Sequence, residues 1–506
     1  MVSYNEIIEN DYVLSKDGLK WIEFNKSISV LREKYPNILD DFKSFDGFAF
    51  PSSDYVTQFE NLKKKVKLLQ ISNVNQTEWI INETQKFEYV PDKYLQSKKR
   101  YLLNSECILI SLTGGTDTDN DITSYFDNSF KAFLNQRVSA FSMKEYNKDY
   151  FFYFYAMTKT KSFKEQWLGK GGIQKNTVAS DRAKTYLPKI DNLEVVNFIS
   201  VLTQAIINKE KLIKERHEAI LKAIETELLE NQKPNRFSFE LPRINELEKV
   251  GRLDTSMYSY DYRFLKHKLI NYTNGCKSFF NINEGRVNFK KGPNLAISVI
   301  GQSIYSDKEY ASFYQLLLSK NFTKFNTLVK KEYIGNTVSL PLIQKGDFLY
   351  SCRGDMGRVL LMIDEPPKST TNFDCAIISF PNQALYKTIY ITQFLNYLRE
   401  KKYVSKIAIT GSGADSFTKY QFDLLDIPNF PETKQKEIAL LYHNGEVEYN
   451  AETFTLANFL GKDNEYNQEV GIYELDKTAK QLKEILNQTI DKIVNDIEVK
   501  IDFQIF

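Results

Sequence analysis

Several residue types and patterns that mark particular classes of protein are scarce in this 506-residue chain. It has four cysteines and three histidines, and no two cysteines are spaced as Cys-x-x-Cys. A structural zinc site is therefore not expected, and reduced cytoplasmic thiols are the better interpretation. The chain has no apolar run long enough to span a membrane, and its first residues lack the basic and apolar regions of a signal peptide. We therefore expect a soluble, cytoplasmic protein without a membrane role.

Positive and negative charges almost cancel in this chain. The net charge of +2 is the difference between 67 basic and 65 acidic residues, so a nucleic-acid site would need a local cluster of cations. Length and a hydrophobic content of 42% predict two to four domains. Most of the 31 tyrosines and 36 phenylalanines should lie in β-sheet cores, and a minority could stack on bases or sugars.

Signatures of catalysis are also missing from the sequence. A methyltransferase that acts on exocyclic amines needs an Asn/Asp-Pro-Pro-aromatic tetrad, whereas residues 364–367 (DEPP) are followed by Lys368. We found no Walker lysine loop, metallohydrolase histidine pair or nuclease carboxylate–lysine cluster. The sequence therefore predicts a protein without chemistry of its own.

The clearest pattern that is present is an internal repeat. Residues 102–190 realign on residues 342–430 at an offset of 240 without a gap. A duplicated module predicts a protein that grips two places on one extended partner. The matched landmarks are Leu102 with Leu342, Leu109 with Leu349, Ser111 with Ser351, Gly114 with Gly354, Phe133 with Phe373, Ser139 with Ser379, Phe154 with Phe394, Gly171 with Gly411 and Pro188 with Pro428.

Both copies have the sequence pattern that is typical of β-rich modules. Short apolar runs separated by turn residues predict strands, and the mixture with helical segments predicts an α+β fold. The expected strands are 66–71, 107–112 and 150–156 in the first module and 287–289, 295–300, 348–350, 376–380 and 407–410 in the second.

Each module is followed by a helical segment with an apolar seam. The first seam, roughly 37 residues or about 55 Å long, ends at residues 231–234, and residues 432–442 predict a shorter helix. DNA makes a full turn in roughly 34–36 Å, so modules on such a rod could contact one duplex at two places. Pairing the seams as an antiparallel coiled coil would give a pseudo-two-fold arrangement, although a hairpin used only for dimerisation is an open alternative. The seams are Ile199, Leu202, Ile206, Ile213, Ile220, Ile224 and Leu228, and Leu475, Ala479, Leu482, Leu486, Ile490, Ile493 and Ile497.

Glycine-containing loops follow matched strands and supply candidate DNA-binding residues. Gly114 and Gly115 would let a backbone approach a phosphate, and Arg353 of the second copy suits phosphate or guanine. Each residue taken singly is more often a corner glycine or a surface arginine.

A second pair of loops lies at residues 169–176 and 411–419. Gln174 and Asn176 carry amides that could read adenine, and Lys170 and Lys175 could neutralise phosphates. Ser412 and Lys419 are the candidates in the second copy. A polar surface loop is the plainer interpretation, and the recurrence in both copies puts the DNA-binding interpretation on an equal footing with it.

Basic clusters punctuate both modules. Lys98, Lys99 and Arg100 form one cluster, and Lys290 and Lys291 form another. Each alone is usually a solvated face. Their presence in both copies mildly favours a polyanionic partner.

In order and spacing, the motifs of this chain resemble those of the DNA specificity subunit of type I restriction-modification enzymes. The resemblance covers nearly the whole chain and adds Gln136 and Arg137 to the candidate residues. The motifs are 47–51 (GFAFP), 71–74 (ISNV), 108–114 (ILISLTG), 134–138 (LNQRV) and 171–176 (GIQKN with its preceding glycine) in the first half, and 251–254 (GRLD), 346–349 (GDFL) and 427–431 (IPNFP) with Gln435, Ile438 and Ala439 in the second.

The resemblance implies a non-catalytic subunit whose two target recognition domains each read one half of a bipartite, asymmetric double-stranded DNA site. The helices would set the spacer and dock two methyltransferase subunits, and motor-nuclease subunits would join for restriction. No cofactor is implied in this chain, while S-adenosylmethionine and ATP are expected on the partner subunits. The implied segments are recognition domain 1 at 1–190, a central spacer helix at 191–234, recognition domain 2 at 235–431 and a C-terminal helical region at 432–506.

Two departures from the family pattern affect the helices. The first module ends at residues 187–191 without the usual glutamine-containing helix start, and residues 444–469 interrupt the second helical region. The alternative interpretation is a coiled-coil interaction protein with β-rich binding modules and no DNA role.

Overall fold

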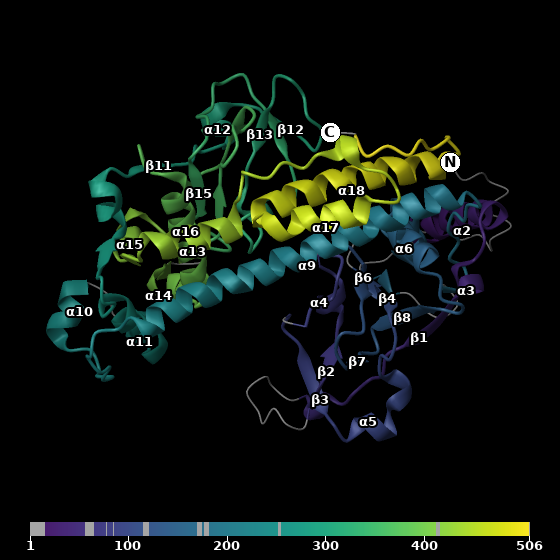
Figure 1. Ribbon diagram of the computed structural model, residues 1–506, viewed down its shortest axis with the longest axis horizontal. Coiled ribbons are helices and arrows are strands. Elements are labelled where there is room, and N and C mark those ends of the chain that lie inside the picture. Colours follow the sequence, from purple (N-terminus) through teal and green to yellow (C-terminus); the bar gives the residue numbers. More distant parts are fainter. Residues whose placement is uncertain are drawn as a thin grey trace. The chain divides into compact units, whose positions relative to one another are not determined.

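The computed structural model forms two compact units, whose elements are labelled in Figure 1. Unit 1 comprises Met1–Leu212, Glu448–Gln468 and Lys477–Phe506, and unit 2 comprises Ile213–Val447 and Glu469–Asp476. Each β-rich module thus belongs to a unit that also takes in helical segments from later in the chain. The structure describes residues 16–55, 65–76, 78–83, 85–114, 121–168, 175–176, 182–250, 255–410 and 415–504.

Unit 1 contains two main sheets. A four-stranded sheet has the order β1-β8-β4-β6, all antiparallel, and a three-stranded sheet has the order β3-β2-β7. Strand β4 is buried on both faces, with Ile108 and Ile110 in one apolar cluster and Leu109 in another. The strands are β1 (Phe42–Asp46), β2 (Lys65–Leu69), β3 (Glu88–Pro91), β4 (Cys107–Ser111), β6 (Thr123–Phe126), β7 (Ala132–Leu134) and β8 (Val138–Met143), with the short pair β5 (Thr113–Gly114) and β9 (Lys175–Asn176).

The helices of this module come before, between and after its strands in the chain. The strands expected at 66–71 and 107–112 are confirmed as β2 and β4. The helices of the module are α2 (Lys16–Lys34), α3 (Ile38–Asp41), α4 (Ile71–Val74), α5 (Tyr94–Ser97), α6 (Lys148–Met157) and α7 (Lys161–Leu168), with short 3-10 turns at Ser52–Asp54 and Lys99–Tyr101.

Helix α6 replaces the strand expected at 150–156, so that prediction is wrong. The helix begins after Asn147, whose side chain accepts hydrogen bonds from the N–H groups of Asp149 and Tyr150. Residues 151–157 are all buried, so they show no alternation of apolar and polar positions. A uniformly apolar run does not distinguish a buried helix from a strand.

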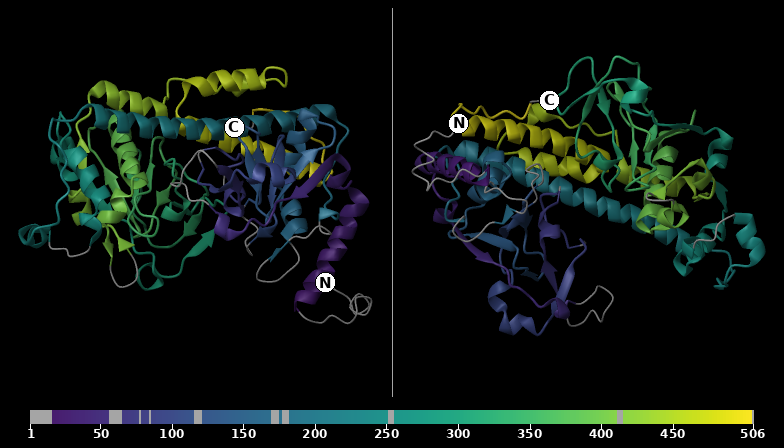
Figure 2. Two further views of the ribbon diagram at one scale, coloured as in Figure 1. Left: turned by 90° about the horizontal axis from the view of Figure 1, so that it is seen from below. Right: turned by 180° about the vertical axis from the view of Figure 1, so that it is seen from behind.

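Long helices pack on the module of unit 1, and the longest of them, α9 (Leu193–Glu230), also continues into unit 2. Helix α9 has 38 residues, about 57 Å at ~1.5 Å per residue, and ends just before the predicted stop. Helices α17 (Phe459–Glu469) and α18 (Ile472–Val494) lie alongside α9 in Figures 1 and 2. Within unit 1, apolar residues of α9 and α18 share one core cluster with the module.

Helices α9 and α18 run antiparallel, as expected. Phe198, early in α9, packs on Phe503 beyond α18, whereas Glu210, later in α9, pairs with Lys483 within α18. All seven residues of the first predicted seam are buried, and so are six of the second. Ile497 is the exception, because α18 ends at Val494 and leaves this side chain 56% exposed.

Unit 2 repeats the two-sheet plan. One four-stranded sheet has the order β11-β18-β15-β16 and another has the order β12-β14-β13-β17. The expected α+β class with two β-rich modules and long paired helices is therefore confirmed. The strands are β10 (Cys276–Ser278), β11 (Asn288–Lys291), β12 (Ile304–Ser306), β13 (Tyr314–Leu316), β14 (Tyr333–Gly335), β15 (Phe348–Ser351), β16 (Val359–Leu361), β17 (Ser369–Thr370), β18 (Cys375–Ser379), β19 (Ile409–Thr410), β20 (Asp415–Ser416) and β21 (Asp426–Pro428).

The helices of unit 2 test three further predictions. The helix expected at 432–442 is confirmed as α16 (Glu432–Tyr442). The strand expected at 295–300 is wrong, because Ile297–Ile300 forms the single turn α12, where Ile297 is 72% exposed. The run 407–410 divides between a helix and strand β19. The remaining helices are α10 (Ile244–Val250), α11 (Tyr260–Ile270), α13 (Leu385–Glu400), α14 (Tyr403–Ile407) and α15 (Lys419–Asp423), with 3-10 turns at Thr255–Tyr258, Phe279–Gly285 and Ser319–Asn321, and Ala451–Thr453 forms one in unit 1.

The repeat carries insertions, so the gap-free offset of 240 is wrong in the middle of the module. The strand pairings make Phe133 of unit 1 equivalent to Thr370 of unit 2, and Ser139 equivalent to Ala376, an offset of 237. The loop between β4 and β6 is four residues longer than the loop between β15 and β16, and a one-residue difference of opposite sign before β7 and β17 leaves the net offset of 237. The N–H of Ser111 bonds to Ile122, whereas the N–H of Ser351 bonds to Arg358, a shorter connection. Surface loops change length without disturbing a ladder.

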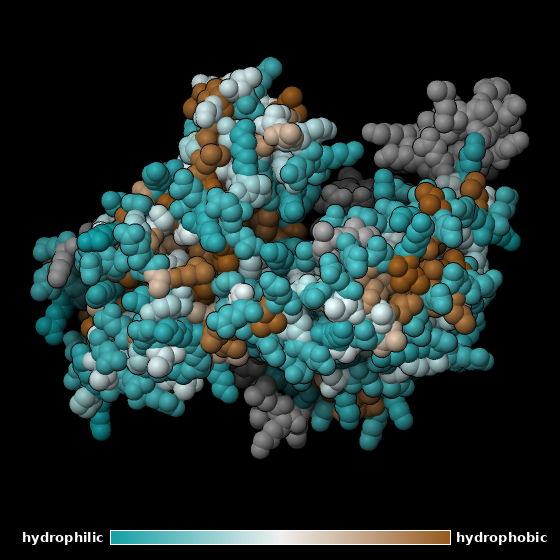
Figure 3. Space-filling view, turned by 45° about the horizontal axis from the view of Figure 1, so that its top comes forward, coloured by the Kyte–Doolittle hydropathy of each residue, from teal (hydrophilic) through white to brown (hydrophobic). Residues whose placement is uncertain are grey.

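Hydrophilic side chains predominate on the face shown in Figure 3, with separate hydrophobic areas. All four cysteines are free, and three are buried. Among the residues that the structure describes, no helix is both long enough and apolar enough to cross a membrane.

Candidate nucleic-acid interface

The two modules share a hydrogen-bonded frame. Main-chain and tyrosine hydrogen bonds of unit 1 have counterparts in unit 2, with donors and acceptors at equivalent places. They are Leu103 N–H to Ala132 O and Ile343 N–H to Ser369 O, Leu112 N–H to Arg137 O and Cys352 N–H to Asp374 O, and Tyr153 Oη–H to Pro188 O and Tyr390 Oη–H to Pro428 O.

A tight turn between β7 and β8 is the most constrained part of this frame. A Cβ at Gly47 would lie 2.1 Å from the carbonyl oxygen of Asn135, so only glycine allows that approach. The turn closes on itself, because the Oδ1 atom of Asn135 accepts from the N–H of Arg137 at 3.1 Å. Unit 2 repeats each contact with Gly292, Asn372 and Asp374 in these roles, and its Cβ distance would be 2.0 Å.

The glycine-containing strand joins this turn to the second candidate loop. In unit 1, Thr113 pairs with Asn176 and Gly114 pairs with Lys175. In unit 2, Arg353 forms the matching bridge with Ser416. Each unit therefore brings three segments together at one end of its sheet: the turn, the strand end and the second loop.

We call these three segments the tip of each unit: residues 135–137, 112–114 and 175–176 in unit 1, and residues 372–374, 352–354 and 415–416 in unit 2. The candidate residues Gly115, Lys170, Gln174 and Ser412 lie outside the described residues. Lys175 and Asn176 are described only in their backbone pairing. Their DNA-binding roles stay predictions.

An aromatic surface carries the cations of unit 1. Lys98 places its Nζ atom 4.2 Å from the ring centroid of Phe48, and Arg100 lies 4.6 Å from the ring of Tyr101. The rings of Phe48 and Tyr101 are 5.1 Å apart, and the carbonyl oxygen of Phe48 accepts from the N–H of Gln136 at 3.1 Å. These residues therefore connect to the tip.

Exposure separates the candidates of unit 1. Lys99, Arg100, Gln136 and Arg137 are exposed, and Lys98 is half-buried. Cations that rest on aromatic rings keep their charge at the surface and lose less freedom on binding an anion. The sequence prediction named all five residues, but it missed Phe48 and Tyr101.

The tip of unit 2 is built differently on the same frame. The guanidinium carbon of Arg353 lies 4.8 Å from the ring centroid of Phe373, and the Nζ atom of Lys291 lies 5.9 Å from it. The Nη1 atom of Arg353 is 4.0 Å from the Oδ1 atom of Asp374. Two predicted cations therefore converge on one aromatic ring at the tip.

The other two candidates of unit 2 are exposed but are not joined to this cluster by a contact. Lys290 precedes Lys291 on β11 and points from the opposite face of the strand. Lys419 begins α15 after a Thr418–Gln421 capping box, and its Nζ atom lies 5.2 Å from the ring of Phe280. The gap-free alignment hid Phe373 and Asp374, because it matched Phe373 with Phe133 rather than with Gln136.

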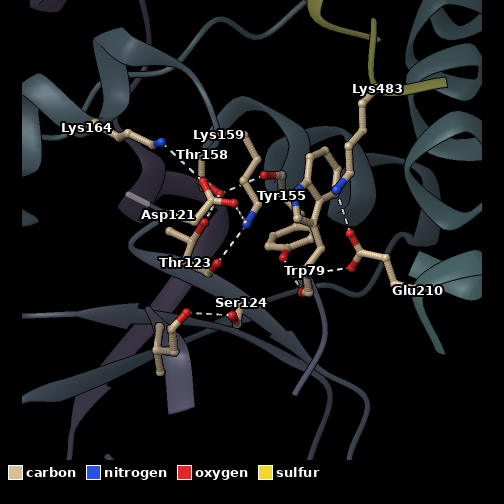
Figure 4. A network of polar contacts seen from close by, with 11 residues as sticks. Trp79, Asp121, Thr123, Ser124, Tyr155, Thr158, Lys159, Lys164, Glu210 and Lys483 are labelled. Atoms are coloured by element: carbon tan, nitrogen blue, oxygen red, sulfur yellow. Dashed lines mark hydrogen bonds and ion pairs between the residues drawn. The ribbon is translucent and has the colours of Figure 1, made fainter. Parts of the chain in front are cut away.

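A buried polar network fastens the module of unit 1 to its helices (Figure 4). The Nζ atom of Lys159 donates to the carbonyl oxygen of Thr123 at 2.7 Å and lies 3.3 Å from Asp121 Oδ2, above the ring of Trp79. Burial lowers the pKa of Lys159 to about 8, although Asp121 acts to raise it.

Glu210 links this network to the helices. Its carboxylate accepts from the N–H of Trp79 at 2.5 Å and from Lys483 Nζ at 2.6 Å. Burial raises the pKa of Glu210 above its ordinary value, and Lys483 opposes that rise. The module is therefore held to α9 and α18 by a desolvated ion pair rather than by apolar packing alone.

The chain matches no protein-family profile and no curated protein. Among solved structures it matches a type-I restriction-modification S subunit from M. genitalium, with 10% identity, a TM-score of 0.41, and coverage of 90% of this chain and 95% of that chain. It also matches the HsdS subunit from Thermoanaerobacter tengcongensis, with 13% identity, a TM-score of 0.25, and coverage of 90% and 96%.

A third match comes from a study of assembly and conformational transition in the type I R-M system, with 11% identity, a TM-score of 0.26, and coverage of 91% and 98%. The resemblance found in the sequence is thus accompanied by matches over about 90% of the chain to an S subunit, an HsdS subunit and a structure of the type I R-M system.

Proposed function

We propose that this chain is the non-catalytic DNA sequence-recognition subunit of a type I restriction-modification complex. Each unit reads one half of a bipartite, asymmetric site in double-stranded DNA. The observation that carries the proposal is the pair of tips, in which one hydrogen-bonded frame presents two different sets of exposed side chains. Phosphate contacts position a protein on DNA, whereas side chains that reach base edges specify the sequence.

The cations in and beside the tips support DNA as the partner. Lys98, Lys99, Arg100 and Arg137 belong to unit 1, and Lys291 and Arg353 belong to unit 2. The overall charge is nearly neutral, so these cations form local clusters of the kind that a polyanion requires.

The long helices have their own part in the proposal. Helix α9 contributes residues to both units and sets the spacer between the half-sites, and the helical segments dock two methyltransferase subunits. Motor-nuclease subunits join for restriction. S-adenosylmethionine and ATP bind to those partners, and this chain needs no cofactor.

A domain exchange tests the modular organisation. Residues 1–190, the proposed first recognition domain, are replaced by the corresponding segment of another chain of this kind, and modified adenines are mapped across the genome. We expect one half of the target to change while the other half and the spacer stay the same. A change in both halves, or in neither, contradicts the proposal.

Salt dependence separates this function from that of a coiled-coil interaction protein. The complex is purified through an affinity tag on this chain from its native cell, and its retention of random-sequence duplex DNA is measured at rising salt. Phosphate contacts make the affinity fall steeply between roughly 50 and 200 mM salt. DNA retention that is absent at every salt concentration favours the coiled-coil protein.

A further inference from the structure

Arg353 holds a fixed place at the tip of unit 2. Its backbone forms a bridge with Ser416, and its carbonyl oxygen accepts from the Oγ–H of Ser351 at 3.0 Å. The next residue back, Cys352, donates its N–H to Asp374 at 2.7 Å. These contacts fix the backbone of Arg353, and therefore the position of its Cα and Cβ atoms.

The guanidinium group of Arg353 is oriented by its neighbours, but it donates no hydrogen bond to the nearby carboxylate. It lies against the ring of Phe373, and its Nη1 atom is 4.0 Å from Asp374, beyond hydrogen-bond distance. The side chain is 45% exposed. A ring and a carboxylate thus restrict the rotamers of Arg353, while its N–H groups remain available to a ligand.

Other arginines of unit 2 are committed to the fold. Arg358 and Arg399 both donate to the carboxylate of Asp355, at 2.5 and 2.7 Å. Arg263 donates to Glu246 and to the carbonyl oxygen of Glu240, both at 2.7 Å. Arg353 differs from these three because its nearest carboxylate, that of Asp374, lies 4.0 Å away and accepts no hydrogen bond from it.

The matched positions in unit 1 carry the opposite arrangement. The counterpart of Arg353 is Thr113, and the counterpart of Asp374 is Arg137. A cation therefore stands on the strand end in unit 2 and on the turn in unit 1, across the same main-chain hydrogen bond. The two tips cannot present the same pattern of donors and acceptors to a base pair.

We infer that Arg353 is a specificity-determining residue that reads a guanine in the half-site bound by unit 2. Its two terminal N–H groups donate to O6 and N7 in the major groove, the geometry for which a guanidinium fork is suited. Asp374 and Phe373 are positioning residues, and Lys291 contacts a neighbouring phosphate. This inference rests on the proposed function and names the base that one half of the site must contain.

Selection from a random-sequence duplex library tests the inference. The tagged complex from its native cell is used with the full-length chain, either unchanged or as Arg353→Gln. The unchanged chain should enrich a site with a fixed G·C pair in one half. The Arg353→Gln variant should lose the preference at that pair by about 10-fold or more and keep the other half unchanged.

Arg286→Gln is the matched control. Arg286 is also in unit 2, lies 3.8 Å from Glu284 and is 65% exposed, but it is not part of the tip. This variant should enrich the same site as the unchanged chain. Asp374→Asn should weaken the guanine preference, and Asp374→Glu should restore it, while the melting temperature of each variant stays near that of the unchanged chain.

Three results overturn the inference. If Arg353→Gln keeps the guanine preference, another residue reads that base. If it lowers affinity for all sequences equally, Arg353 is a phosphate contact. If the unchanged complex enriches no sequence at all, the proposed function fails and the inference falls with it.

Discussion

Glu210 on α9 pairs with Lys483 on α18 at 2.6 Å, and the same carboxylate accepts from the main-chain N–H of Trp79 in the module of unit 1. One side chain therefore holds three segments together. Because Glu210 is buried, its removal leaves the N–H of Trp79 without its acceptor and takes the carboxylate away from Lys483.

We expect Glu210→Ala to lower the free energy of unfolding of unit 1 by about 2–4 kcal/mol. Urea unfolding of the full chain measures this change. Glu225→Ala is the control, because Glu225 pairs with Lys401 at a surface where the side chains are 40% and 39% exposed. That variant should lose less than about 1 kcal/mol. Equal losses would show that burial of Glu210 contributes nothing.

The glycines beside the turns should not tolerate a methyl group. Gly47→Ala and Gly292→Ala would each place a Cβ about 2 Å from a main-chain carbonyl oxygen that is fixed within the turn. Each substitution should cost about 2 kcal/mol or more, measured by thermal or urea unfolding. Gly461→Ala is the control, since Gly461 lies in α17 and a Cβ added there would meet no atom within 4 Å. It should be neutral or stabilising by up to about 1 kcal/mol.

Lys159 predicts a pH dependence of stability. Its pKa falls from 10.5 to about 8 on folding, chiefly because the ammonium group is buried. Between about pH 8 and pH 10.5 the unfolded chain binds more protons at this residue than the folded chain does. The contribution of Lys159 to the free energy of unfolding therefore increases as the pH rises through this range. Comparison of the unchanged chain with Lys159→Met removes the effects of other groups.

The difference in unfolding free energy between these two chains should change by about 2 kcal/mol from pH 8 to pH 10, in favour of the unchanged chain at the higher pH. Denaturant titrations at several pH values measure it. A difference that is constant over this range would mean that Lys159 keeps its ordinary pKa in the folded chain.

The matched tyrosines should contribute similarly in the two units. Tyr153→Phe and Tyr390→Phe each remove a buried hydrogen bond to a proline carbonyl, at 3.0 and 2.7 Å. We expect each to cost about 1–2 kcal/mol. Tyr146→Phe, which removes a hydrogen bond from an exposed tyrosine to Glu106, should cost less than about 0.5 kcal/mol. The free energies of unfolding are measured by urea titration. If Tyr146→Phe lowered the free energy of unfolding as much as the other two substitutions, the two buried hydrogen bonds would not contribute to the shared frame.

The sequence predicted elements that have a clear period or boundary. The seam of α9 and helix α16 follow the expected pattern, because an apolar stripe and a polar stop are both local signals. The aromatic run that forms α6 could not be assigned in this way, since burial on every side removes the period. Its conformation depends on the sheet and helices that surround it.

The candidate site was predicted in part. The strand ends and second loops of the tips were located through the repeat, which named Arg353, whereas Arg137 was named through the resemblance to the family motif at 134–138. Phe373 and Asp374 were not named as partners of Arg353. An alignment without gaps cannot show that the connections between matched strands differ by a net three residues. The hydrogen bonds between the strands of each sheet show this difference directly.

The close approach of Gly47 to Asn135, repeated by Gly292 and Asn372, separates what holds a tip in place from what it displays. Main-chain contacts hold each turn, while the neighbouring side chains Gln136 and Arg137 in unit 1 face the surroundings. Substitutions of such exposed side chains should therefore change what a tip presents with little cost to folding. Under the proposed function, each unit could then change its half-site in a few substitutions, independently of its duplicate.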